Sequence, residues 1–401
     1  MMKRVNSILE RIGRRFPDRR AGTALLALGV LVLGGIGLRS VLRPRSRPPA
    51  GPPVTRVFLS SFHMISQTEG WGVTSDPDTG QESVLKTSDG GTTWTYASPA
   101  LPFGDEVFIS TAFLDSDSAW VAASVEAEEA AQPSVSVLGT SDGGVTWKEK
   151  GELPIADVPQ LDFIDRDTGW AFAIVGVSGG AEAYELFRTT DGGSHWGLVS
   201  AATSPQIKGR ASTPNSVPPC GLAGVSFVDA STGWLPTSCA GHPALYESRD
   251  GGSSWSRQRL GPSDSPYREG TLGLPVFTSP RDGFLLDKGV SGGTDLLYVT
   301  HDAGAHWRPV NLPVRDFDVG PAFSDSLNGW LVSNGTVYRT TDGGGRWTAV
   351  SRVPIGSAES TSLRLDFATT EVGWISSTDP SAPLLIKTTD GGRTWKASNL
   401  D

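Results

Sequence analysis

The sequence predicts an all-β protein, a seven-bladed β-propeller of four-stranded blades, preceded by one N-terminal transmembrane helix. Three observations lead to this prediction. A short motif recurs seven times, an aromatic pattern recurs in step with it, and one uncharged apolar run lies near the N-terminus. Glycine (49 residues) and proline (28 residues) are also more frequent than in an average globular chain, as expected where a chain turns often.

The recurring motif consists of a hydroxyl residue, one variable residue, Asp, Gly or Ala, Gly, two variable residues and Trp. Its seven copies are Thr87–Trp94, Thr140–Trp147, Thr189–Trp196, Ser248–Trp255, Thr300–Trp307, Thr340–Trp347 and Thr388–Trp395. The aspartates of successive copies lie 40 to 59 residues apart. Self-similarity at such a period indicates a stack or ring of small, similar units.

A second pattern accompanies the motif. An aromatic residue precedes each copy, and a large apolar residue lies seven positions before that aromatic. The aromatic residues are Trp71, Trp120, Trp170, Trp234, Phe284, Trp330 and Trp374, and the apolar residues are Met64, Phe113, Phe163, Phe227, Phe277, Phe323 and Phe367. The six tryptophans of this pattern and the seven of the motif account for all 13 in the chain. We therefore interpret the tryptophans as core residues rather than as a ligand-stacking surface.

Each repeat is typical of four short strands. The first carries the large apolar residue, the second begins at Gly-Trp, the third precedes the motif, and the fourth starts at the motif tryptophan. The Asp-Gly step predicts a tight turn, because Gly accepts positive φ and Asp bonds nearby backbone amides. Four-stranded units repeated around an axis form a β-propeller. We interpret the motif aspartates as structural turn residues: Asp89, Asp142, Asp191, Asp250, Asp302, Asp342 and Asp390.

The strand order places two kinds of connection on opposite faces of the predicted propeller. The turn between the first and second strands and the motif turn share one face, which we call the motif rim. The remaining connections vary in length, and we call their face the variable face; long examples are Val121–Pro133, Gly176–Ala183, Ser200–Pro219 and Gly261–Pro275. Binding usually resides in such loops. We expect partner contacts from four residues in the two longest of them, Lys208, Arg210, Tyr267 and Arg268.

The N-terminal region predicts a membrane anchor. Residues 1–20 form a basic cytoplasmic segment, 21–39 the transmembrane anchor, 40–53 an Arg/Pro-rich linker and 54–401 the propeller. The run Ala21–Leu38 holds eighteen residues without a charge, just enough for a helix to cross a hydrocarbon core. The basic residues before it favour a cytoplasmic N-terminus and an extracytoplasmic propeller, a single-pass arrangement in the cell membrane. A cleaved signal peptide is the alternative, although no small-residue cleavage site follows the run.

The charge distribution argues against nucleic-acid binding. Residues 1–50 carry eleven Lys and Arg against two acids, a net charge of +9. The whole chain has a net charge of −9, so residues 51–401 have a net charge of −18. An acidic body repels phosphate backbones.

The two cysteines, Cys220 and Cys239, flank a predicted hairpin turn near Asp229–Thr232 in the fourth repeat. Export would permit a disulfide between them, and free thiols are the alternative. The histidines show no metal-ligand spacing, so we expect no metal. One feature of the ring stays open, because Val54–Leu59 can either start the first blade or complete the last.

The motif resembles the Asp-box repeat of bacterial neuraminidases. That repeat occurs in sialidases, in glucan-cleaving glycoside hydrolases, in sortilin-type receptors and in a photosystem II stability and assembly factor family. Seven motifs, most of them partnered by a Gly-Trp strand, are most similar to the assembly factor family. The resemblance implies a non-catalytic scaffold that binds a membrane protein or membrane-associated complex and needs no cofactor. The chain departs from the usual motif at His195, Ser254, His306 and Arg346 in place of Thr, and at Ala303 in place of Gly.

A glycan-directed protein is the alternative function, either a sialidase-like or other glycoside hydrolase or a lectin-like binder. The resemblance to sialidases implies a Phe-Arg-Ile-Pro element, which this chain lacks, since Arg352-Val-Pro354 has neither the Phe nor the Ile. Glycosidases need two carboxylates across the scissile bond, and no segment marks such a pair. We therefore predict no enzyme and assign no catalytic residue.

Overall fold

The computed structural model describes residues 58–76, 80–100, 109–125, 134–205, 207, 211–264, 269–289, 295–314, 317–353, 363–377 and 385–397. They belong to one compact unit, Pro44–Asp401. Within these ranges, no helix has the length and apolar character needed to cross a membrane. The predicted anchor at 21–39 lies outside them.

The described strands form seven antiparallel sheets, each built from consecutive strands. The first four blades comprise β1 (Ser61–Met64), β2 (Gly70–Ser75), β3 (Glu82–Thr87) and β4 (Thr95–Tyr96); β5 (Ile109–Phe113), β6 (Ala119–Val125), β7 (Ser134–Thr140) and β8 (Lys148–Leu153); β9 (Gln160–Phe163), β10 (Gly169–Ser178), β11 (Ala181–Thr189) and β12 (Gly197–Ala202); β13 (Ser226–Phe227), β14 (Gly233–Cys239), β15 (His242–Ser248) and β16 (Ser256–Gln258). After the 3-10 helix η1 (Gly261–Asp264), the last three comprise β17 (Gly270–Leu272), β18 (Val276–Phe277), β19 (Gly283–Gly289), β20 (Leu296–Thr300) and β21 (Arg308–Asn311); β22 (Val319–Phe323), β23 (Gly329–Ser333), β24 (Thr336–Thr340) and β25 (Thr348–Arg352); β26 (Leu363–Phe367), β27 (Gly373–Ser377), β28 (Leu385–Thr388) and β29 (Lys396–Ala397).

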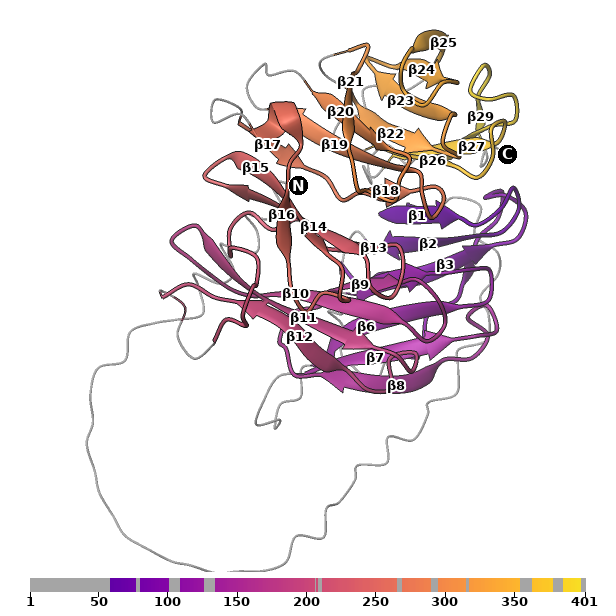
Figure 1. Ribbon diagram of the computed structural model, residues 1–401. Coiled ribbons are helices and arrows are strands. Elements are labelled where there is room, and N and C mark those ends of the chain that lie inside the picture. The colour runs from indigo at the N-terminus through magenta and orange to yellow at the C-terminus, as the bar shows by residue number, and fades with distance from the viewer. Residues whose placement is uncertain are drawn as a thin grey trace, which may run out of the picture. The chain divides into compact units, whose positions relative to one another are not determined.

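The prediction of an all-β, seven-bladed propeller with four-stranded blades is confirmed (Figure 1). The fifth blade departs from it in one detail. Its inner strand is broken into β17 and β18, which both pair with β19. Between them, the Gly273 amide still donates to the Leu286 carbonyl oxygen of β19 at 2.8 Å, and the pairing lapses at Leu274 and Pro275. Proline has no N–H to donate to a sheet, which accounts for the interruption at Pro275.

Burial differs systematically across a blade. Every residue of the second strand β23 is buried, whereas both residues of the outer strand β29 are exposed. A middle strand is covered by neighbouring blades on both faces, so it is apolar throughout rather than alternating. Outer strands such as β16 and β29 are short and largely exposed, as suits open sheet edges facing solvent.

In four of the Gly-Trp pairs the glycine makes room for the aromatic ring of the first strand, and in the first blade Gly70 makes room for the Met64 side chain. Gly169 pairs with Phe163 across β9 and β10, and a Cβ atom on Gly169 would lie 2.5 Å from the Phe163 ring. Gly233, Gly329 and Gly373 stand in the same relation to their own phenylalanines. The glycine is therefore required by packing within the blade.

The tryptophan of each Gly-Trp pair joins its blade to the next one. Trp170 stacks on Phe227 of the following blade, with ring centroids 3.7 Å apart and planes 1° from parallel. Its Nε1 donates to the carbonyl oxygen of Gly251, in the motif of that same following blade, at 2.9 Å. Trp330 repeats both contacts with Phe367 (3.6 Å) and Gly391 (2.9 Å).

A basic side chain covers several of these tryptophans. It belongs to the residue immediately before the motif hydroxyl, which lies opposite the tryptophan across the second and third strands. Four such cations lie 4.9 to 5.4 Å from the ring centroids: Lys86 over Trp71, Arg188 over Trp170, Arg339 over Trp330 and Lys387 over Trp374. Cations at this distance are attracted to the ring face.

The ring closes between the seventh and first blades, and the described strands of these two blades belong to separate sheets. Leu59 is buried in one cluster with Trp94 of the first blade and Trp374 of the seventh. The amide of Ser60 donates to the carbonyl oxygen of Val73 on β2 at 2.8 Å. The described part of the segment that precedes β1 therefore belongs to the first blade, and the last blade is complete with its own four strands.

We predict that Trp330→Ala lowers the free energy of unfolding by about 3–5 kcal/mol, because it empties a fully buried interface site. Urea denaturation followed by far-ultraviolet circular dichroism measures the change. Tyr96→Ala is the matched control, since Tyr96 is 45% exposed on an outer strand and its replacement should cost less than about 1 kcal/mol. Equal losses in the two variants would contradict the assignment of Trp330 to the core.

Candidate functional site

The motif forms a closed hydrogen-bonded turn on the motif rim. The Thr87 hydroxyl donates to Oδ1 of Asp89 at 2.9 Å and accepts the Gly91 amide at 2.9 Å. Oδ1 of Asp89 also accepts the Thr93 amide at 2.9 Å, and Oδ2 accepts the Thr93 hydroxyl at 2.6 Å. The carboxylate therefore bridges the start and end of the turn.

The departures from the usual motif preserve this turn. Nδ1 of His195 lies 2.6 Å from Oδ2 of Asp191, and Nδ1 of His306 lies 2.7 Å from Oδ2 of Asp302. Each imidazole occupies the place of the threonine hydroxyl. Ala303 holds a positive φ of 59° where the other copies have glycine, so this turn carries some backbone strain.

Hydrogen bonds hold the motif carboxylates in their ionised form. In Asp191 the His195 side chain and amide are the main cause, and they lower the pKa to about 2. In Asp302 and Asp390 burial acts in the opposite direction, but the hydrogen bonds outweigh it and the pKa again falls to about 2. The other four motif aspartates also have lowered pKa values. Carboxylates occupied in this way are poorly suited to proton transfer, which supports a structural role.

The motif turn and the turn between the first and second strands lie together, as expected of a shared rim. In all seven blades the amide that follows the motif aspartate donates to a carbonyl oxygen of the other turn, as Gly251 does to Ser231 and Ala303 does to Arg281. These bonds measure 2.8 to 2.9 Å. On the motif rim of each blade, the two turns are therefore joined to one another by a backbone hydrogen bond.

Two carboxylates occupy the described inner strands, and they do not converge. Oδ2 of Asp162 on β9 accepts the Phe227 amide at 2.8 Å, and Oδ2 of Asp366 on β26 accepts the Met64 amide at 2.7 Å. Each carboxylate therefore binds the next blade. Burial raises the pKa of Asp162 to about 7, although its bond from Phe227 acts in the opposite direction. The arrangement differs from that of a glycosidase, whose two carboxylates face one another across the substrate.

The four residues expected to contact a partner, Lys208, Arg210, Tyr267 and Arg268, lie outside the described residues. The described part of the loop that carries Lys208 and Arg210 is well anchored. Val217 is buried, and its amide donates to the Tyr184 hydroxyl at 3.0 Å. Glu182 on β11 accepts the Leu222 amide at 2.8 Å through its carboxylate. The third blade therefore holds this connection of the variable face.

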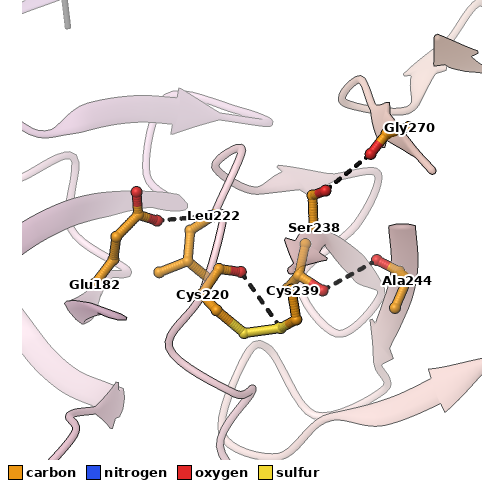
Figure 2. Close-up of a disulfide and its surroundings, with 8 residues drawn as sticks. Glu182, Cys220, Leu222, Ser238, Cys239, Ala244 and Gly270 are labelled. Atoms are coloured by element: carbon orange, nitrogen blue, oxygen red, sulfur yellow. Dashed lines mark hydrogen bonds between the residues drawn. A yellow bond between two sulfur atoms is a disulfide. The ribbon is translucent and has the colours of Figure 1, made fainter. Parts of the chain in front are cut away.

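A disulfide joins Cys220 to Cys239, with their Cα atoms 5.0 Å apart (Figure 2). Cys239 ends β14, whereas Cys220 lies in the chain before β13 rather than within a strand. Figure 2 also shows Ser238 beside the disulfide, where its hydroxyl donates to the carbonyl oxygen of Gly270 at 2.8 Å. The disulfide fixes the end of the long variable loop to the fourth blade.

Among the described residues, no group of three or more His, Cys, Asp and Glu side chains is arranged to hold a metal ion. Sequence reasoning also missed two features, the cations that cover the tryptophans and the inner-strand carboxylates that bind the next blade. The first had a signal, because Lys or Arg directly precedes the motif hydroxyl in four of the seven copies.

Comparison with known proteins supports the similarity inferred from the motif. Residues 276–401 match a family model described as photosynthesis system II assembly factor YCF48. The photosystem II assembly lipoprotein Ycf48 of Synechococcus sp. (strain CC9902) is 31% identical over 134 residues. The predicted similarity to the photosystem II assembly factor family is confirmed. The match to Ycf48 covers 31% of this chain and 36% of the length of that relative.

Solved structures share the fold over most of the chain. YCF48 from Cyanidioschyzon merolae is 19% identical with a TM-score of 0.51, covering 84% of this chain and 97% of that one. A GH74 xyloglucanase from Xanthomonas campestris is 15% identical with a TM-score of 0.56, covering 88% and 56%. An oligogalacturonate lyase from Vibrio parahaemolyticus is 6% identical with a TM-score of 0.55, covering 85% and 92%. At these identities the likeness extends to the fold alone.

We predict that stability falls steeply in acid. The motif aspartates have lowered pKa values in the fold, while an unfolded aspartate titrates near about 3.9. Their stabilisation is present above about pH 4 and is lost as the pH falls towards about 2. Urea denaturation at pH 5, 4, 3 and 2.5 measures the slope. Asp390→Asn should make the slope shallower, whereas replacing exposed Asp157 by Asn should not; identical slopes in all three proteins would contradict the prediction.

We also predict that the disulfide stabilises the fold. Replacing Cys220 and Cys239 together by serine should lower the free energy of unfolding by about 3 kcal/mol, because the bridge closes a chain segment 19 residues long. Reductant should lower the stability of the natural protein by a similar amount and leave the double variant unchanged. A natural protein that is insensitive to reductant would show that the bridge contributes nothing.

Proposed function

We propose that this chain is a non-catalytic, membrane-anchored scaffold that binds a membrane-protein complex through the variable face of its propeller. The observation that carries the proposal is the similarity of residues 276–401 to the photosystem II assembly factor family. The related Ycf48 is named as a photosystem II assembly lipoprotein, so photosystem II is the first complex to test as a partner.

The chemistry of the described residues supports a binding role. The motif aspartates are occupied by hydrogen bonds within their own turns, and the inner-strand carboxylates bind backbone amides of the next blade. The described part of the long loop between β12 and β13 is anchored at Val217, Leu222 and Cys220 by Tyr184, Glu182 and the disulfide. An anchored loop loses little conformational entropy when a partner binds, which favours protein recognition.

We propose that residues 21–39 anchor the propeller, with the N-terminus in the cytoplasm and the propeller outside it. The related Ycf48 is named as a lipoprotein, which is consistent with a propeller held at a membrane. The anchor that we propose is the apolar run Ala21–Leu38, whose eighteen uncharged residues are long enough for a helix to cross a hydrocarbon core.

The proposal predicts that a tagged full-length chain, crosslinked in native membranes and purified, recovers a membrane-protein complex. Two double variants, Lys208→Ala with Arg210→Ala and Tyr267→Ala with Arg268→Ala, should each lower recovery by about tenfold or more, the size expected for interface hot spots. The matched control is Arg166→Ala with Arg346→Ala on the motif rim, which should leave recovery unchanged. Absence of a protein partner together with hydrolysis of a glycan panel would overturn the proposal.

A further inference from the structure

The interface between the seventh and first blades, which we call the seam, is the place where the ring closes. β1 and β26 lie side by side there (Figure 1). Each described strand pairs within its own blade, so none of them runs from one side of the seam to the other. Closure therefore depends on side-chain packing and on hydrogen bonds between side chains and backbone.

Part of the seam repeats the other interfaces. Nε1 of Trp374 donates to the Gly90 carbonyl oxygen at 2.8 Å, and Nζ of Lys387 donates to the Gln67 carbonyl oxygen at 3.2 Å. The packing partner differs, however. Met64 occupies the position at which each of the other six blades presents a phenylalanine to the preceding blade. A thioether packs adaptably but lacks the ring-on-ring stacking found elsewhere, as between Trp170 and Phe227.

The seam also contains a histidine next to a carboxylate. Oδ2 of Asp366 accepts the Met64 amide at 2.7 Å and lies 3.4 Å from Nδ1 of His63. The interface between the third and fourth blades has the same carboxylate-to-amide bond, from Phe227 to Asp162, but Ser226 stands there in place of the histidine. His63 is the one histidine on the described inner strands. The pair is thus peculiar to the closing interface.

We propose that His63 and Asp366 form a pH-dependent latch that closes the propeller ring. When His63 is protonated, its charge attracts Asp366 across the seam and keeps the carboxylate in place to accept the Met64 amide. When His63 is neutral, that attraction is lost, and the seam opens more often than the other blade interfaces.

The surroundings of the pair determine the direction of the effect. Burial lowers the pKa of His63, but the hydrogen bond and charge attraction from Asp366 outweigh it and raise the pKa above 6.5. Strand β26 presents Arg364 and Asp366, whereas β2, β5 and β27 carry no ionisable side chain. Lys387 and Asp89 lie towards the motif-rim end of the seam.

The stabilising effect of the latch is complete below about pH 6.5 and is lost as the pH rises through the folded-state pKa of His63. The imidazole is 55% exposed and the Asp366 side chain 22% exposed, so water screens the attraction. An exposed ion pair of this kind changes an opening equilibrium by roughly threefold.

Hydrogen exchange of the full-length chain, followed by mass spectrometry from pH 5.5 to 8.0 and corrected for intrinsic rates, tests the latch. Peptides containing β1 and β26 should exchange roughly threefold faster at the upper end, relative to the peptide containing β22. The β22 peptide is the reference because the interface between the fifth and sixth blades has Val276 at the position of Asp366. That interface therefore has no carboxylate at this position to respond to pH. His63→Gln should abolish this relative change.

Asp162→Asn serves as a matched control, because it alters the corresponding bond between the third and fourth blades and should leave the seam unchanged. Thermal unfolding checks that His63→Gln, at a half-exposed site, retains the fold. The latch is disproved if β1 and β26 follow the same pH course as β22, or if the His63→Gln variant keeps the course of the natural protein. The test requires no partner, so its outcome is independent of the proposed scaffold function.

Discussion

The stacking of an indole from one blade on an aromatic ring of the next is the interaction on which this structure depends. A four-stranded sheet covered on both faces needs apolar side chains on both, and it cannot bury them alone. One buried tryptophan removes roughly 200 Å² from water, at most about 5 kcal/mol per side chain. Trp170 shows how one side chain also orients the contact, since its ring meets Phe227 and its Nε1 binds Gly251.

The interface between the fourth and fifth blades shows how this interaction tolerates change. Glu247 replaces the basic residue opposite Trp234 and pairs with Arg249. Nε1 of Trp234 no longer binds a motif glycine and donates instead to Oε1 of Gln258 at 3.2 Å. The same oxygen accepts Nε1 of Trp307 at 3.1 Å, and the side-chain amide of Gln258 bonds to Gly304. Gln258 thus links Trp234 of the fourth blade to Trp307 and Gly304 of the fifth, in place of the direct bond from tryptophan to glycine.

The parts of the fold that repeat were predictable from the sequence, because seven copies of one pattern carry the same packing demand. The number of blades, the turn role of the motif aspartates and the shared motif rim follow from that repetition. The cations over four of the tryptophans were missed because Gly139, Glu247 and Val299 interrupt the pattern in the other three blades. The bonds from Asp162 and Asp366 were missed because each depends on the neighbouring blade, which a single strand does not reveal. The partner-binding residues stay predictions, since variable loops have no repeat to constrain them.

Each sheet pairs only its own consecutive strands, and this has a consequence for how such a ring can change during evolution. In a propeller whose first and last strands share one blade, duplicating a blade or moving the chain start must divide that blade or supply its missing strand. Here a duplicated segment from one variable-face connection to the next inserts a whole blade with its hydrogen bonding intact. Circular permutation at such a connection likewise leaves every backbone ladder unbroken. Only the complementary surfaces of neighbouring blades, such as Met64 against Trp374, need to adapt.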